Sequence, residues 1–313
     1  MSKLSLVHEQ SGSLRIWYGD QELAQYVYRP TDRQLESPRP YWHPLHTLGG
    51  DQVSLYRPHD HVWHKGIAFS LPNLAGPDGT ENFWGGPTYL RGRDYVQLPN
   101  DGAMVHQEFL DLNSDGEQIS IRQRLDWITQ AGRRWVAEER AWSVHVLADH
   151  GWLLRFATRL TNVSGHDLVF GSPTTEGRQN AGYGGLFWRG PRSFSGGTAH
   201  LPAGSGKDEL MGARSPWLGF TGQHDDHGRH STLVFVDAPA NLGHPTRWFV
   251  RSEMFACVCP APFFADEYQL APAATLPLRY AVAIADGDLG HSGTEQLATT
   301  AAAALAQWEV GTP

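Results

Sequence analysis

The sequence contains very little cysteine, with only Cys257 and Cys259 among 313 residues. Residues two apart on a strand point to the same face, and a disulfide at that spacing is badly strained. A zinc site would need more thiols or a different spacing. We therefore expect both cysteines to be buried and reduced, as in a cytoplasmic protein.

Long apolar runs are also missing. The first residues, Met1 to Glu9, hold no apolar stretch of the kind that a signal peptide needs. No segment reaches the roughly 18 to 20 apolar residues of a membrane helix. We expect a cytoplasmic protein without a membrane partner.

Basic clusters are the third absence. The chain has 25 lysines and arginines against 33 aspartates and glutamates, which gives a net charge of −8. Without a basic stripe, nucleic acid is excluded as an expected partner. The overall field also disfavours polyanionic substrates, although a local pair of arginines can overrule it.

Alternation of apolar and polar residues, the period of a β-strand, recurs along most of the chain. It predicts strands at residues 13–18, 118–127, 135–146, 152–161, 232–236, 247–251 and 276–285. Three long strands between about residues 104 and 163, joined by short turns, predict an antiparallel meander. No helix–strand alternation appears, so we expect one all-β domain over residues 1–313, a large antiparallel β-sandwich.

One helix is predicted, at the C-terminus. Ser292 and Glu295 match a capping box, and residues 296–308 have high helix propensity. Leu297, Leu305 and Trp308 share a face with Ala301, so we expect this short helix to dock on the sheet.

The strongest functional signal is a group of five histidines close in sequence: His43, His46, His59, His61 and His64. Buried ring nitrogens need hydrogen-bond partners, so such a group is costly as plain core. Histidine also titrates near neutrality. We interpret the group as the lining of a polar pocket and expect pH dependence between about 5.5 and 8.

Two uses of the histidines remain open. His61 and His64 can act as general base and acid, and Lys65 would lower their pKa values if it pointed inward. Alternatively, they hold a divalent metal with a carboxylate such as Asp60, although the spacing matches no known metal motif. The sequence itself requires no cofactor.

A second segment, residues 172–189, is rich in glycine and carries Glu176 and Arg178. Its glycine spacing fits no nucleotide-binding loop. The two charged residues have the composition of a site rim, or alternatively form a weak surface ion pair. A third segment, residues 237–251, carries Asn241, His244 and Arg251, and a fourth, residues 81–86, is expected to shape a pocket wall.

Several motifs together resemble those of a bacterial family of unknown function that has been labelled the methane oxygenase PmoA family. They are Arg39–Pro44, Asp60–Gly66, Asn82–Trp84, Thr175–Gly177, Gly185–Arg189 and Pro245–Arg251. A methane monooxygenase subunit of that name is a membrane protein, so the label does not fit a chain without a spanning segment. Members of the family look like companions of sugar-oxidising enzymes, which implies work on carbohydrates.

The strand pattern also resembles the galactose-mutarotase supersandwich, with its long antiparallel strands and histidine-lined concave face. A mutarotase pairs a histidine acid with a glutamate base. Glu176 and Glu253 are the candidates for that glutamate here.

The leading hypothesis is an enzyme of the lyase, epimerase or hydrolase type that acts on a sugar, a keto-sugar or a glycoside. Its catalytic residues would be His61, His64, Glu176, Arg178 and Arg251, with the arginines or a metal polarising a carbonyl. The residues expected to contact the small carbohydrate ligand are His43, His46, His59, Trp63, Lys65, Asn82, Trp84, Asn180, Tyr183, Trp188 and Arg189.

The alternatives are a non-catalytic carbohydrate-binding or sensor protein, in which aromatic residues dominate binding, and a two-carboxylate glycosidase. The last has the least support, because no pair of acidic residues stands out. A homodimer remains open.

Overall fold

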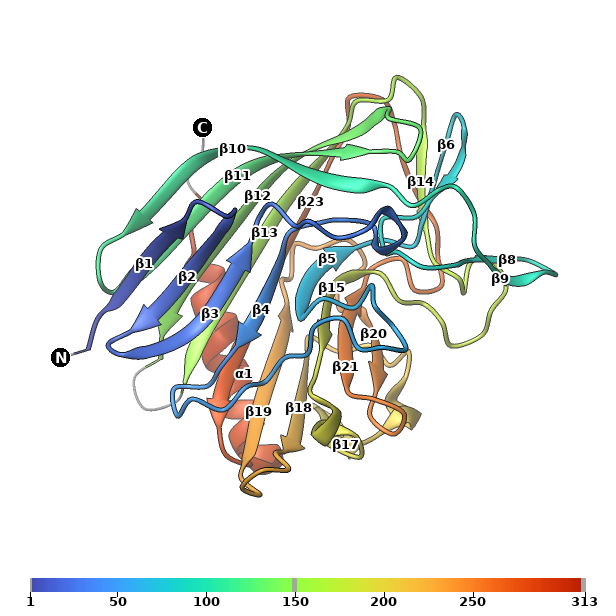
Figure 1. The fold of residues 1–313 in the computed structure, drawn as a ribbon. Helices are drawn as coiled ribbons and strands as arrows, with labels where there is room; N and C mark the ends of the chain where they lie inside the picture. The colour runs from blue at the N-terminus through green and yellow to red at the C-terminus, as the bar shows by residue number, and fades with distance from the viewer. Residues whose placement is uncertain (1, 148–150, 311–313) are drawn as a thin grey trace.

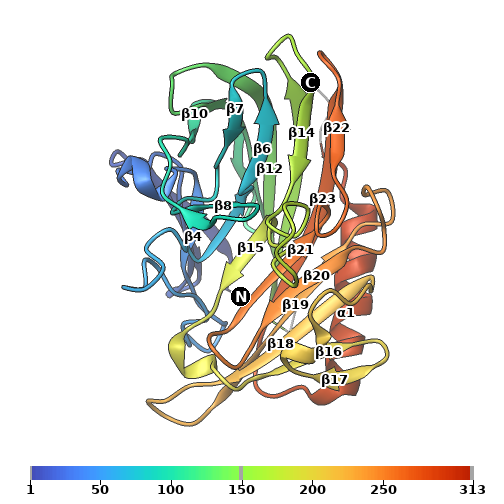
Figure 2. The ribbon, with the colours of Figure 1, turned by 90° about the vertical axis from the view of Figure 1, so that its right-hand side faces the viewer.

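The computed structural model describes residues 2–147 and 151–310. Within them most regular structure is antiparallel β-sheet, and two large sheets pack face to face (Figure 1). The C-terminal helix, α1 (Gly290–Gln307), lies along the outer side of the second sheet (Figure 2).

The first large sheet has the strand order β1-β2-β3-β4-β5-β15-β21-β20. The strands are β1 (Leu4–Glu9), β2 (Ser13–Tyr18), β3 (Gln21–Val27), β4 (Tyr41–Leu45), β5 (Ile67–Ser70), β15 (Gly185–Arg189), β21 (Cys257–Ala261) and β20 (Arg247–Arg251). Its last three strands come from the second half of the chain, so distant segments meet at this end of the sheet.

The second large sheet has the order β10-β11-β12-β13-β23-β19-β18-β16-β17. The strands are β10 (Ala103–Ser114), β11 (Gln118–Ile128), β12 (Arg134–Val146), β13 (Trp152–Asn162), β23 (Thr275–Asp286), β19 (His230–Asp237), β18 (Trp217–Gln223), β16 (Thr198–Leu201) and β17 (Gly204–Gly206).

Smaller elements complete the described chain. Two further sheets have the orders β22-β14-β6-β7 and β8-β9. Their strands and the 3₁₀ turns are β6 (Asn73–Gly76), β7 (Gly79–Glu81), β8 (Thr88–Leu90), β9 (Asp94–Val96), β14 (Leu168–Gly171), β22 (Tyr268–Leu270), η1 (Gln34–Glu36), η3 (Arg192–Phe194) and η4 (Asp208–Leu210).

The all-β prediction is confirmed, and every predicted strand is present. The predicted meander was one strand short, since β10 to β13 form four antiparallel strands. The alternation of β10 is masked in the sequence by two register irregularities, after His106 and after Phe109.

The core lies between the two sheets because alternate residues of each strand point inward. On β12, Trp142 and Val144 join this core, while Ala141 faces α1. Small residues such as Ala281 and Ala283 on β23 let the helix approach closely.

The predicted helix face, with Leu297, Leu305 and Trp308, is buried as expected. The predicted capping box is wrong. The helix begins earlier, at Gly290, whose N–H donates to Asp288 Oδ1 at 2.9 Å. No helix within the described residues combines the length and the apolar character that crossing a bilayer requires.

Candidate functional site

A cavity of about 350 Å³ lies on the outer face of the first sheet, over β15 and β20. This volume falls within the range of about 300–1,000 Å³ that is typical of small-molecule sites. Its walls are largely aromatic, made by Trp63, Trp84, Tyr95, Tyr183, Phe187, Phe249 and Phe255. The remaining lining residues are His61, His64, Gly85, Pro87, Arg178, Arg251 and Met254.

Strand alternation places the floor of the cavity. Phe187 on β15 and Phe249 on β20 point outward, whereas their neighbours Trp188 and Trp248 point into the main core. Cys257 and Cys259 pack under the same outward cluster. Both are buried and free, as predicted.

Two tight turns in the loop before β5 bring His61 and His64 together. The backbone N–H of His64 donates to the carbonyl of His61 at 2.9 Å, and that of His61 donates to Pro58 at 3.0 Å. The two rings are stacked, with centroids 4.8 Å apart and planes 23° apart. Phe255 packs on both of them.

Burial favours the neutral form of both histidines, and more strongly so for His64. It lowers the pKa of His64 well below the usual value, and the neighbouring His61 and the guanidinium of Arg189 add to this. Burial also lowers the pKa of His61, but Asp60 opposes the shift, because its Oδ2 lies 3.4 Å from His61 Nδ1. His64 Nδ1 is buried and has no hydrogen-bond partner among the described residues.

Asn82 shapes one wall without lining it. Its Oδ1 accepts hydrogen bonds from the backbone N–H groups of Trp84 and Gly85, both at 2.9 Å, and its Nδ2 donates to the carbonyl of Gly86 at 2.9 Å. Gly86 has φ +72°, and a Cβ there would lie 2.7 Å from the Trp63 ring. Glycine therefore lets Trp63 lie directly over this loop.

Arg178 reaches the cavity from the loop that follows β14. Its Nη1 donates to the hydroxyl of Tyr95, and its Cζ lies 4.6 Å from the Tyr95 ring centroid. The hydroxyls of Tyr95 and Tyr183 are 2.9 Å apart. Burial raises the pKa of Tyr183 well above its usual value, so this phenol stays protonated.

Arg251 closes the other side at the end of β20. Its Nη1 lies 3.7 Å from Asp208 Oδ2, and its side chain is 27% exposed. Asp208 is already engaged, since its Oδ1 accepts the backbone N–H of Ser252 at 2.6 Å. Arg251 therefore keeps hydrogen-bonding capacity for another group.

The structure thus brings His61, His64, Arg178 and Arg251 to one cavity, although they come from segments far apart in the sequence. Trp63, Trp84 and Tyr183 of the predicted ligand contacts also line it.

The placement predicted for Glu176 is wrong. Glu176 lies in a turn that is closed by a hydrogen bond of 2.9 Å from the backbone N–H of Arg178 to the carbonyl of Pro173. The backbone carbonyl of Glu176 accepts a hydrogen bond from Arg91 Nε. Residues two apart in such a turn point to different sides, so Arg178 faces the cavity and Glu176 does not line it.

Three of the five clustered histidines also lie outside the cavity. His43 bonds Ser54 Oγ at 2.9 Å and stacks on Tyr56, and burial lowers its pKa to about 4. His46 follows on the same strand segment and uses its carbonyl to accept the Trp152 indole N–H. His59 is exposed beside Arg192.

The other predicted ligand contacts that do not line the cavity are Lys65, Asn82, Asn180, Trp188 and Arg189. Lys65 points away and forms buried ion pairs with Asp32 at 3.0 Å and with Glu36. Asn180 is exposed, and Trp188 faces the core because it is one residue out of phase with Phe187. Arg189 lies behind Phe255.

A group with metal-ligating potential lies away from the cavity. His224, Asp226 and His227 have ligand atoms within 4.8 Å of one another in the β18–β19 hairpin. His227 Nε2 is 2.9 Å from Asp51, which also pairs with Arg229 at 2.5 Å. This group is separate from His61 and His64.

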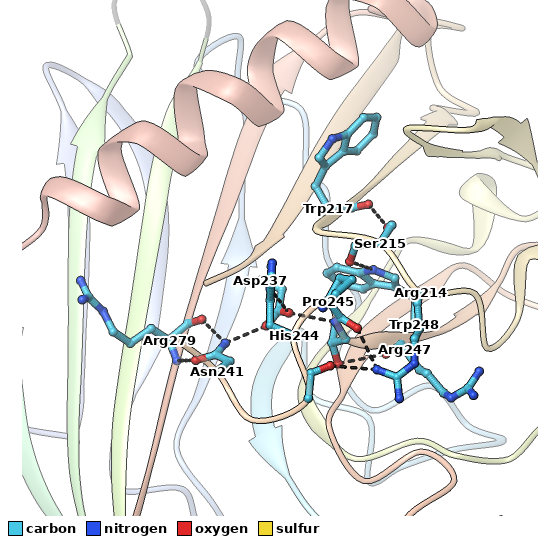
Figure 3. A network of polar contacts seen from close by, with 12 residues as sticks. Arg214, Ser215, Trp217, Asp237, Asn241, His244, Pro245, Arg247, Trp248 and Arg279 are labelled. Atoms are coloured by element: carbon cyan, nitrogen blue, oxygen red, sulfur yellow. Dashed lines mark hydrogen bonds and ion pairs between the residues drawn. The ribbon is translucent and has the colours of Figure 1, made fainter. Parts of the chain in front are cut away.

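The polar residues of the segment 237–246 form a structural network (Figure 3). The buried carboxylate of Asp237 accepts hydrogen bonds from Asn241 at 2.7 Å, from His244 Nδ1 at 2.8 Å and from the backbone N–H of Thr246 at 2.9 Å. These contacts fix the loop that precedes β20, and Arg251 is the last residue of that strand.

Sequence reasoning missed the apolar walls, above all Tyr95, Phe187, Phe249 and Phe255. A usable signal existed for two of them. Arg251 and Phe249 share one face of a strand, as do Arg189 and Phe187. An arginine that is predicted to point outward therefore predicts that the phenylalanine two residues before it points outward too.

Fold and site together define an all-β sandwich with an aromatic, histidine-containing cavity of small-molecule size. The chain belongs to a family described as "Family of unknown function (DUF6807)", whose model matches residues 13–299. No curated protein matches the sequence.

Several solved structures are distantly similar. An α-galactosidase from Lactobacillus brevis is 10% identical with a TM-score of 0.39, and the match covers 92% of this chain and 38% of that one. The GH36 α-galactosidase AgaA from Geobacillus stearothermophilus is 11% identical with a TM-score of 0.43, covering 94% and 40%. Galactose 1-epimerase from Lactobacillus acidophilus NCFM is 9% identical with a TM-score of 0.39, covering 92% and 99%. This chain therefore spans about two fifths of either α-galactosidase.

Proposed function

We propose that the cavity binds a small carbohydrate and that His61 and His64 carry out acid–base chemistry on it. The observation that carries the proposal is the stacked pair of histidines inside an aromatic cavity. Aromatic walls pack against the apolar faces of sugar rings. Titratable groups gathered in a cleft with lowered pKa values are typical of functional sites.

The geometry suggests different roles for the two histidines. His64 is the deeper one and is held neutral by burial, so it suits a general base. His61 is half-exposed, and Asp60 favours its protonated form, so it suits an acid that exchanges protons with solvent. Arg178 and Arg251 stand where a developing oxyanion would need positive charge.

The supported reaction class is proton abstraction next to a carbonyl of a keto-sugar or keto-glycoside, followed by epimerisation or by loss of the glycosidic oxygen. No aspartate or glutamate is among the described residues that line the cavity. That composition disfavours both a two-carboxylate glycosidase and a histidine–glutamate mutarotase pair.

The direct test is deuterium exchange. Keto-sugars and keto-glycosides are incubated with the protein in D₂O, and proton NMR follows loss of signal at the carbon next to the carbonyl. We expect wild type to catalyse exchange and His64→Ala to slow it by about 10²- to 10⁴-fold while binding persists. His166→Ala, which removes an exposed histidine, is the matched control. Binding without exchange in wild type would refute the catalytic proposal.

A second candidate is a non-catalytic carbohydrate-binding or sensor protein, favoured by the predominance of aromatic side chains in the walls. In that case Trp84→Leu would weaken binding far more than His64→Ala, and no exchange would occur with any sugar.

Acid–base steps of this kind need no cofactor, and a divalent metal on His61 and His64 stays an alternative. A single domain, a cytoplasmic location, a homodimer and a relation to proteins labelled PmoA stay predictions from the sequence.

A further inference from the structure

Among the charged side chains that the structure describes, Arg189 lacks the most hydrogen-bond partners. Its side chain is fully buried, yet none of its three guanidinium nitrogens has a hydrogen-bond partner among the described residues. Its Cζ lies 3.9 Å from the ring centroid of Phe255, so the only close support is a cation–π contact. A buried charge without an ionic partner destabilises the folded state, so a ligand-related role for Arg189 is worth testing.

The position of Arg189 connects it with the cavity. It shares the outward face of β15 with Phe187, which is part of the cavity floor. Phe255, whose ring supports the Arg189 guanidinium, lines the cavity, whereas Arg189 itself does not. The nearby carboxylate of Asp60 is taken by Arg192 at 2.6 Å.

The rest of the cavity is also cationic. Arg178 donates to the hydroxyl of Tyr95 and has no carboxylate partner among the described residues, and the carboxylate contact of Arg251 there is the long one with Asp208. No described acidic residue lines the walls. The cavity is thus locally cationic although the chain has a net charge of −8.

We propose that the sugar bound here carries an acidic group, a carboxylate or a phosphate, that pairs with Arg178 and Arg251. Arg189 acts through Phe255 as a positioning residue that adds positive charge behind this wall. In a region shielded from water such a charge acts more strongly than at the surface. The inference rests on the proposed binding of a carbohydrate and adds its chemical class.

The test compares ligands on the wild-type protein by calorimetry. The probes are D-glucuronate, D-galacturonate and glucose 6-phosphate, with D-glucose and D-galactose as neutral counterparts and acetate and inorganic phosphate as acids without a sugar. We expect the acidic sugars to bind about ten- to a hundred-fold more tightly than the neutral ones, with a preference that weakens as salt is added. The uronates and the phosphate distinguish the two acidic groups.

Three further outcomes are decisive. Equal affinity for acidic and neutral sugars overturns this inference and leaves carbohydrate binding intact. Acetate or phosphate binding as tightly as the acidic sugars supports the anion site but refutes the carbohydrate. Binding of none of the probes counts against both.

Variants then locate the charge. Arg251→Gln should remove most of the acidic preference, because the affinity for the acidic sugars should fall much more than the affinity for the neutral ones. Arg189→Met should reduce the preference and Arg189→Lys should restore it, whereas a purely structural Arg189 would change stability without changing the ratio of affinities. Arg159→Gln makes the same change of charge at an exposed site on the other large sheet and should leave the ratio unchanged.

Discussion

The rings of His61 and His64 are stacked, with their centroids 4.8 Å apart. Two imidazoles this close do not both carry a charge, because each proton raises the cost of the next. The pair therefore holds at most one proton over the neutral range, and His61, beside Asp60, is the better place for it. One neutral base and one acid can thus coexist in a single cavity.

The pH profile of turnover should report this pair. Burial lowers the pKa values of both histidines, so the base is already neutral at pH 6.5. We therefore expect kcat/KM for deuterium exchange to fall only below pH 6.5. That is the low end of the pH range of about 5.5 to 8 that the sequence indicates. A rate that is still rising steeply at pH 8 would contradict a neutral histidine base.

Arg251→Ala should reduce turnover by orders of magnitude and leave Tm nearly unchanged. Its only charged contact among the described residues is the 3.7 Å approach to Asp208, and half-exposed pairs of this kind add little stability. Steady-state kinetics and a thermal melt on the same preparation check both parts. If the variant unfolds while the folded fraction keeps normal specific activity, Arg251 is a structural residue.

Asp101→Asn should stabilise the protein above neutral pH. Burial raises the pKa of Asp101 to about 7, and its Oδ1 has no partner among the described residues. Because the folded state holds this proton more tightly than the unfolded chain, with a pKa of about 4, wild-type stability falls as pH rises from about 4 to about 7. The variant lacks this loss, so its Tm at pH 8 should exceed that of wild type by a few degrees.

The same comparison at pH 4 should show little gain, since Asp101 is then protonated in the folded state and only about half ionised in the unfolded chain, so little stability has yet been lost. Asp20→Asn, at an exposed turn, is the control and should shift Tm at neither pH. A gain of equal size at both pH values would mean that the charge of Asp101 is not the cause.

The strands could be predicted from the sequence because their signal is local. Each core-facing side of a strand repeats every second residue, as in β11, and no knowledge of the partner strand is needed. The start of α1 could not be predicted in this way, because Asp288 and the Ser292 motif compete locally, and the structure uses Asp288.

The site was predictable only where local turns decide it. His61 and His64 meet because they lie three positions apart in a tight turn, which the sequence suggested. Their meeting with Phe249 and Phe255 depends on β15, β21 and β20 joining the N-terminal strands in one sheet. Such long-range pairing leaves no mark on a single sequence. The errors at Glu176 and Trp188 have local causes instead, since the turn at residues 173–178 keeps Glu176 out of the cavity lining and Trp188 is one residue out of phase with Phe187.

The loop that carries Trp84 offers a test of the aromatic wall that leaves the histidines untouched. Gly86→Ala would place a Cβ 2.7 Å from the Trp63 ring, in a backbone conformation with φ +72° that alanine adopts only with strain. We expect Trp63 to be displaced from the cavity wall, and sugar affinity to fall several-fold with intrinsic tryptophan fluorescence changing in the same variant. The control is Gly132→Ala, at φ +82° with no heavy atom within 4 Å of the added Cβ.

Since both variants carry similar backbone strain, of order 1 kcal/mol, both should lose similar stability from that source. Only Gly86→Ala should also weaken binding. If the two variants bind sugar equally well, Trp63 does not form part of the binding surface, and the ligand would have to contact other lining residues such as Tyr183 and Phe249.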